Sequence, residues 1–170
     1  MFKNFILSIF LISTFQIFAQ DYKIIPDEKT GEPLILGYCP ASIVIDSLFT
    51  DTWTTEYNNY QPDFETLDSL EGKLEDINIK IVFRSTCSDS REQLPRLFKI
   101  LNELNYNVNS INLIGVNREK QGLSNETEGL EIELVPTIIF YKDGNEIGRI
   151  VETPVESMEK DLLKLIHPTL

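Results

Sequence analysis

The chain has 170 residues, a length typical of one domain of ordinary size rather than two. It carries 15 Lys and Arg residues against 27 Asp and Glu residues, which gives a formal net charge of −12 at pH 7. This acidic balance repels phosphate backbones and anionic membrane surfaces, so the composition argues against nucleic acid as a partner. The hydrophobic fraction of 42% is ordinary for a chain that buries a core.

Residues 1–20 differ from the rest of the chain. A short, weakly basic start with Lys3 is followed by an apolar run from Phe5 to Phe18, and acidic residues begin soon after Ala19. This pattern is typical of a secretory signal peptide, and the run is short for a membrane span. We therefore expect a periplasmic or secreted protein whose mature chain has no membrane span. The alternative is an uncleaved N-terminal anchor, because Ile17 is large for its place before a cleavage site.

Residues 21–75 are expected to form a leader and a helical extension in front of the main domain. The segment 21–33 is polar and contains Pro and Gly, and we interpret it as an extended leader. Between residues 41 and 60 the apolar side chains recur at the spacing of one helix face, and residues 64–75 predict a second helix.

Residues 76–170 are expected to form the main domain, because short apolar runs rich in β-branched residues alternate here with helical spacing. The pattern predicts strands at residues 80–83, 112–116, 137–141 and 146–151, and helices at residues 88–106 and 155–166. The strand–helix–strand unit implies parallel strands, and Asp143 with Gly144 suits a tight hairpin turn. We therefore expect an α/β fold with a mixed sheet covered by helices on both faces.

The chain has two cysteines, Cys39 and Cys87, and one histidine, His167. Their spacing is not that of metal ligands, so we expect no metal and no cofactor. Cys87 follows the strand at 80–83 and begins a helix, where unpaired N–H groups and the helix dipole stabilise a thiolate. A cysteine after a strand is also often a small buried core residue. The position alone leaves both interpretations open.

The segment from Ile81 to Ser90 resembles the active-site segment of thioredoxins. Cys87 falls at the family's first cysteine, Ser88 and Asp89 follow it, and Ser90 stands at the place of the second cysteine. A single motif cysteine followed by Ser-Asp-Ser is also similar to secreted thioredoxin-like proteins of Bacteroidetes-type bacteria. The resemblance implies a reactive cysteine at the start of a helix.

A second segment, Val135–Glu146, resembles the family's proline-threonine strand and its hairpin. Pro136 matches a proline whose preceding peptide bond is cis and which faces the active-site cysteine, here Cys87. Together the two motifs place residues 76–166 within the resemblance, and their order makes it specific for the fold. The resemblance implies a thioredoxin-like fold, with a mixed central sheet flanked by helices and preceded by an N-terminal helical extension.

The departures from the family's motif limit the chemistry that the resemblance implies. Ser90 replaces the second cysteine, Thr86 replaces a tryptophan, and Ile81 replaces the buried aspartate that accepts a proton. A serine cannot attack a mixed disulfide, so the usual intramolecular release of the substrate is missing. Without the aspartate, proton transfer in that step also loses its aid. We therefore do not expect an efficient general dithiol reductase.

The activity that the resemblance still implies, despite these departures, is thiol–disulfide exchange through Cys87 on exported proteins or small thiols. Release would need another thiol, from the substrate, a small molecule or Cys39. The alternative role of Cys39 is structural, either as a free thiol or in a permanent disulfide with Cys87. The alternative function of the chain is a non-catalytic module that binds an extended peptide beside Pro136.

Overall fold

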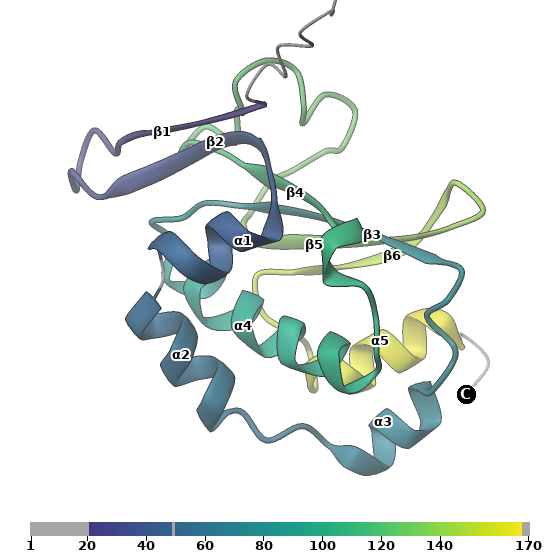
Figure 1. Ribbon diagram of the computed structural model, residues 1–170. Helices are drawn as coiled ribbons and strands as arrows, with labels where there is room; N and C mark the ends of the chain where they lie inside the picture. The colour runs from purple at the N-terminus through teal and green to yellow at the C-terminus, as the bar shows by residue number, and fades with distance from the viewer. Residues whose placement is uncertain (1–20, 49, 168–170) are drawn as a thin grey trace, which may run out of the picture.

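The computed structural model describes residues 21–48 and 50–167, so the predicted signal peptide lies outside the described residues. The strands form one mixed sheet in the order β1-β2-β4-β3-β5-β6 (Figure 1). Only β3 and β4 are parallel among the neighbouring pairs of this sheet. The strands are β1 (Tyr22–Pro26), β2 (Pro33–Cys39), β3 (Ile77–Phe83), β4 (Asn112–Gly115), β5 (Thr137–Lys142) and β6 (Asn145–Val151).

The helices of the described residues precede, connect and follow the strands of the main domain. None of these helices is long and apolar enough to span a membrane. They are α1 (Ala41–Ile43), the π-helical turn η1 (Val44–Leu48), α2 (Thr50–Asn59), α3 (Phe64–Leu70), α4 (Ser88–Glu103), the 3₁₀ turn η2 (Val108–Ser110) and α5 (Met158–Ile166).

The order of elements from β3 onward confirms the predicted fold. β3, α4 and β4 form the strand–helix–strand unit, and a long loop leads to the hairpin of β5 and β6, after which α5 ends the domain. At the hairpin turn, Asp143 and Gly144 have φ angles of 51° and 79°, which is the positive-φ geometry predicted for the Asp-Gly pair. The fold is therefore a thioredoxin-like α/β fold.

The N-terminal segment is a hairpin of the same sheet, and the prediction of an extended leader over residues 21–33 is wrong. β1 pairs with β2 along its whole length. On its other side β2 pairs antiparallel with β4, and Cys39 lies opposite Leu113 in that pairing. The two prolines of this segment make the sequence pattern indicate a loop. In the structure Pro26 and Pro33 lie at the ends of β1 and β2, where a strand tolerates proline. The division of the chain between residues 75 and 76 stays a prediction.

The helices α1 to α5 pack against one face of the sheet (Figure 1), so the prediction of helices on both faces is wrong. The loop of residues 117–136 covers the opposite face, where Val82 and Ile114 contact Leu130 and Ile132. This loop has too few regularly spaced apolar residues for a helix face, and isolated apolar side chains cover the sheet instead. The helix-covered core includes Trp53, Leu67, Leu70, Ile79, Ile81, Phe83, Leu97, Phe98, Leu113, Phe140 and Leu162.

Helix α4 is anchored firmly on that core, which matters because its first turn carries the motif. Leu94, Leu97, Phe98 and Leu101 are fully buried on one side of the helix. Each such side chain contributes about 1.5–3 kcal/mol to folding as an upper estimate. Trp53 of α2 meets Phe98 edge to face, with ring centroids 5.1 Å apart. The N-terminal helices therefore support the helix that begins after Cys87.

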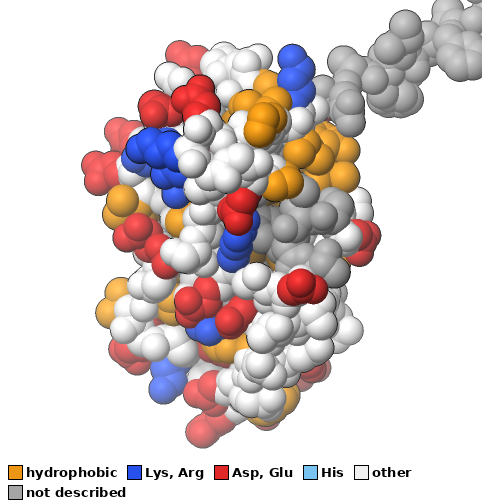
Figure 2. Space-filling view, turned by 90° about the vertical axis from the view of Figure 1, so that its left-hand side faces the viewer, with side chains coloured by type: hydrophobic (Ala, Val, Ile, Leu, Met, Phe, Trp, Pro, Cys, Tyr) orange, Lys and Arg blue, Asp and Glu red, His pale blue; other side chains and the backbone are white. Residues whose placement is uncertain are grey.

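Figure 2 shows one face of the molecule, on which acidic side chains are scattered and basic side chains lie among them. Several basic side chains form ion pairs with acidic ones, including Arg96 with Glu56 and Arg149 with Glu146. Pairs of this kind at the surface contribute little to stability, about 0–1 kcal/mol each.

Candidate functional site

Cys87 is the N-cap residue of α4 and is 9% exposed. Its backbone is extended, and its carbonyl accepts a hydrogen bond of 3.1 Å from the amide of Arg91, which closes the first turn of the helix. Its amide donates to the carbonyl of Arg84 at 3.0 Å, which closes a tight turn after β3. The thiol lies at the positive end of the helix dipole, and it makes no capping hydrogen bond to the first turn of the helix.

The thiol of Cys87 faces the segment that contains Pro136. Its Sγ donates a hydrogen bond to the carbonyl oxygen of Val135 at 3.3 Å. The bond between Val135 and Pro136 is cis, as the resemblance predicted. Thr137 donates to the carbonyl of Leu134 at 2.7 Å, and the amide of Glu152 donates to the carbonyl of Pro136 at 2.7 Å. The two motifs, far apart in sequence, therefore meet at one site.

The motif residues after Cys87 differ in their surroundings. Ser88 is exposed and Asp89 half-buried, and the carboxylate of Asp89 in the first turn of α4 competes with a thiolate for the helix dipole. Ser90 is fully buried, and its Oγ accepts a weak hydrogen bond of 3.4 Å from the amide of Arg84. Ser90 therefore ties the first turn of the helix to the end of β3.

Cys39 does not share this site. Both cysteines are free, and they belong to separate apolar clusters, with Cys39 on the helix-covered face of the sheet and Cys87 in the cluster under the loop. Burial raises the pKa of the Cys39 thiol to about 12. Such a thiol is almost entirely protonated at neutral pH and is a poor nucleophile. The surroundings of Cys39 favour the structural interpretation over a role in releasing substrate.

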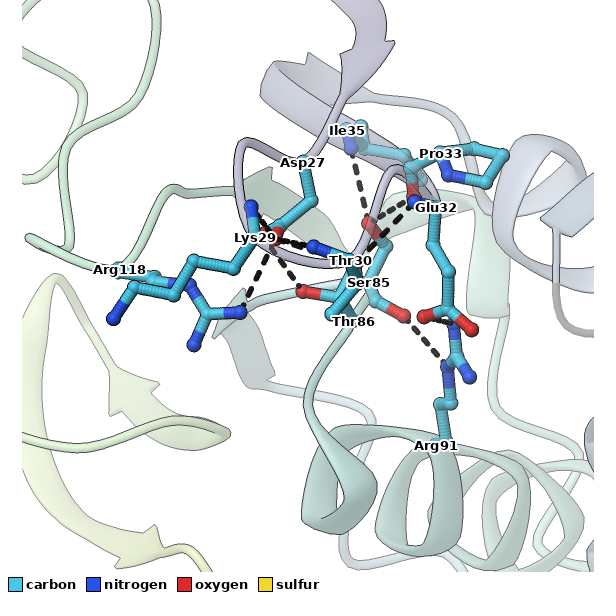
Figure 3. A network of polar contacts seen from close by, with 10 residues as sticks. All are labelled: Asp27, Lys29, Thr30, Glu32, Pro33, Ile35, Ser85, Thr86, Arg91 and Arg118. Carbon is cyan, nitrogen blue, oxygen red and sulfur yellow. Dashed lines mark hydrogen bonds and ion pairs between the residues drawn. The ribbon is translucent and has the colours of Figure 1, made fainter.

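The sequence did not indicate Asp27, whose buried carboxylate lies beside the motif loop (Figure 3). Its Oδ1 accepts hydrogen bonds of 3.0 Å from the amides of Lys29 and Thr30, which shape the turn between β1 and β2. The backbone bond from Thr30 lowers the pKa of Asp27 most, and Lys29 and Arg118 lower it further, although burial opposes them. The pKa of Asp27 lies well below its usual range, so the carboxylate stays ionised.

A metal site is not evident in the parts of the chain that the structure describes. Residues 21–48 and 50–167 contain no group of three or more His, Cys, Asp or Glu side chains that could hold a metal ion.

No protein-family model matches the chain, and no curated protein sequence matches it. Among solved structures, thioredoxin O2 from Arabidopsis thaliana in its oxidized state is similar, with 20% identity and a TM-score of 0.38 over 60% of this chain and 84% of that chain. A protein of unknown function from Pseudomonas aeruginosa is 16% identical, with a TM-score of 0.43 over 70% of this chain and 75% of that chain. An HIV epitope scaffold is 17% identical, with a TM-score of 0.43 over 69% and 72% of the two chains.

Proposed function

We propose that the chain performs thiol–disulfide exchange through Cys87 on exported proteins or small disulfides. The observation that carries the proposal is the position of Cys87, which is the N-cap residue of α4 and lies beside the segment of Val135 and Pro136. Helix N-termini favour the thiolate, which is the nucleophile in such exchange. The pattern of residues 1–20 supports export, where disulfides persist.

The proposed reaction has two exchange steps. The thiolate of Cys87 attacks one sulfur of a substrate disulfide, the S–S bond breaks, and the other half of the substrate leaves as a thiolate. A second thiolate, from the substrate or from a small thiol, then attacks the mixed disulfide, and Cys87 leaves as a thiolate. Bonds are exchanged without net oxidation or reduction. The burial of Ser90 and the separate location of Cys39 support release by an external thiol.

The surroundings of Cys87 support an extended peptide as the substrate. Leu134, which directly precedes Val135, is 44% exposed. Val151 lies on the edge strand β6 opposite Thr137, the residue after Pro136, and is exposed as well. Exposed apolar side chains beside an open strand edge are suited to binding an extended chain through backbone bonds and side-chain contacts.

The same features support a second candidate function, a peptide-binding module without redox chemistry. Its favouring observation is that the thiol of Cys87 is buried and already donates a hydrogen bond. In this function the thiol would only hold the segment of Val135 in place. The two candidates differ in one measurable property, the reaction of Cys87 with a disulfide.

The test uses two short peptides joined by one disulfide, incubated with the reduced mature protein and analysed by mass spectrometry. We expect an adduct of one peptide on Cys87, with release of the other peptide as a thiol. Cys87→Ser should form no adduct, whereas Cys39→Ser should form it as the wild type does. Absence of the adduct in the wild type, with the peptides still bound, would favour the binding module.

A further inference from the structure

The loop that carries Cys87 is held by the N-terminal hairpin as well as by its own helix. Ser85 is buried, and its Oγ donates to the carbonyl of Pro33 at 2.9 Å and accepts from the amide of Ile35 at 3.1 Å. Its carbonyl accepts from Nε of Arg91 in α4 at 2.8 Å. Ser85 therefore joins β2 and α4 at a point two residues before Cys87 (Figure 3).

Thr86, the residue directly before Cys87, is held from the same hairpin. Its Oγ1 donates to Oδ2 of Asp27 at 3.3 Å, while Oδ1 of Asp27 accepts from Nη2 of Arg118 at 3.1 Å (Figure 3). A carboxylate only accepts hydrogen bonds, and bonds to a charged group are stronger than neutral ones. Asp27 therefore connects the hairpin turn, the motif loop and the loop that follows β4.

This connection does not replace the buried aspartate that thioredoxins carry at the position of Ile81. Asp27 is ion-paired with Arg118 and accepts hydrogen bonds on both oxygens, so it is held as a fixed anion and not as a proton acceptor. Its contact with the motif is through the hydroxyl of Thr86 and not through the thiol of Cys87. What the arrangement provides is a fixed position for the loop.

We infer that Asp27 and Thr86 are positioning residues for Cys87, and that the N-terminal hairpin is part of the reactive site. The inference rests on the proposed function, because it concerns the alignment of Cys87 with a bound disulfide. Small misplacements of a reacting group slow a reaction strongly when the substrate is held in a fixed pose. Reaction with a small reagent that approaches from any side depends much less on such alignment.

The test compares Thr86→Val, which removes the hydroxyl, with Thr86→Ser, which keeps it. Thr127→Val is the matched control, since it deletes a hydroxyl that donates to the carbonyl of Lys120 in the loop over the sheet. For each protein, the rate at which Cys87 reacts with the peptide disulfide is divided by its rate with iodoacetamide. We expect this ratio to fall about tenfold in Thr86→Val and to stay near the wild-type value in the other two.

Hydrogen exchange at the amides of residues 85–87 separates this inference from the proposed function. Faster exchange there in Thr86→Val, with unchanged exchange in the core strands and in Thr127→Val, supports the positioning role. If the wild type forms no peptide adduct, the proposed function fails, and the exchange rates then decide only whether Thr86 fixes the position of residues 85–87. The inference is overturned if Thr86→Val leaves the rate ratio unchanged or leaves the exchange at residues 85–87 unchanged. It is also overturned if the ratio falls in Thr86→Ser as much as in Thr86→Val.

Discussion

Sγ of Cys87 lies 3.3 Å from the carbonyl oxygen of Val135 and donates a hydrogen bond to it. The bond links the start of α4 to the segment that enters β5, and it is buried. A buried carbonyl that loses its donor costs about 1–3 kcal/mol, whereas a replacement donor keeps most of the bond. The thiol therefore has a structural role that is separable from any chemical role.

This separation predicts different outcomes for two substitutions of Cys87. Cys87→Ser keeps a donor for the carbonyl of Val135, so we expect its free energy of unfolding to stay within about 1 kcal/mol of the wild type. Cys87→Ala removes the donor and should lose roughly 1–3 kcal/mol. Urea denaturation of both variants measures the difference. Equal stability of the two variants would contradict a contribution from this hydrogen bond.

Cys39 predicts a loss of stability in alkaline solution. Burial raises the pKa of its thiol from 9.0 to about 12, so the unfolded chain ionises at a lower pH than the folded chain. The stabilising effect of this neutral thiol is complete below about pH 9 and is lost as the pH rises toward 12. We therefore expect the stability difference between the wild type and Cys39→Ala to shrink over this range. Urea denaturation at several pH values measures it, and a constant difference would contradict the prediction.

The lowered pKa of Asp27 predicts that the protein loses stability in acidic solution. Backbone bonds from Thr30 and Lys29 and the contact with Arg118 hold its pKa well below the ordinary value of 3.8. Its stabilising effect is complete above that ordinary value and is lost as the pH falls toward the lowered pKa of the folded state. We expect the stability advantage of the wild type over Asp27→Asn to decrease as the solution is acidified below about pH 5.

The control for this measurement is Asp143→Asn, which alters an exposed carboxylate at the turn between β5 and β6. Its stability difference from the wild type should vary little over the same range. If Asp27→Asn and Asp143→Asn follow the same curve, Asp27 does not contribute to the acid dependence as an ionised, hydrogen-bonded group.

The strands and helices from β3 onward could be predicted from the sequence because each has a simple physical signature. Apolar β-branched runs mark the buried strands, the spacing from Leu94 to Leu101 marks one side of α4, and Asp143 with Gly144 marks the hairpin turn. The meeting of Cys87 with the segment of Pro136 followed from the resemblance, since no local pattern connects two segments so far apart.

The N-terminal hairpin could not be predicted, because β1 is an exposed edge strand and lacks alternation of buried and exposed residues. Its turn contains Asp27, a residue that is common in exposed turns and carries no sign of burial. Asp27 is buried beside Thr86 and Arg118, which are distant from it in the chain. The placement of all the helices on one face likewise depends on how the loop of residues 117–136 folds over the sheet.

Substitution of Ser90 by cysteine tests whether an internal resolving thiol is what the site lacks. Ser90 is fully buried one turn inside α4, so Ser90→Cys creates a Cys-x-x-Cys spacing at the helix N-terminus. The introduced thiolate can attack the mixed disulfide on Cys87, release the bound peptide as a thiol and leave an intramolecular disulfide. We expect faster release of the peptide adduct and measurable reduction of insulin by dithiothreitol, followed by mass spectrometry and turbidity.

The gain should be limited, because Ile81 cannot accept the proton that the introduced thiol must lose. The variant should also lose some stability, since a larger sulfur replaces a packed hydroxyl. Ser88→Cys is the matched control, as Ser88 is exposed and adjacent to Cys87, outside the Cys-x-x-Cys spacing. Cys87→Ser combined with Ser90→Cys should show neither the adduct nor insulin reduction. Suppose that the peptide adduct is released no faster from Ser90→Cys than from the wild type and Ser88→Cys. That result would show that the missing second cysteine is not what limits exchange at Cys87.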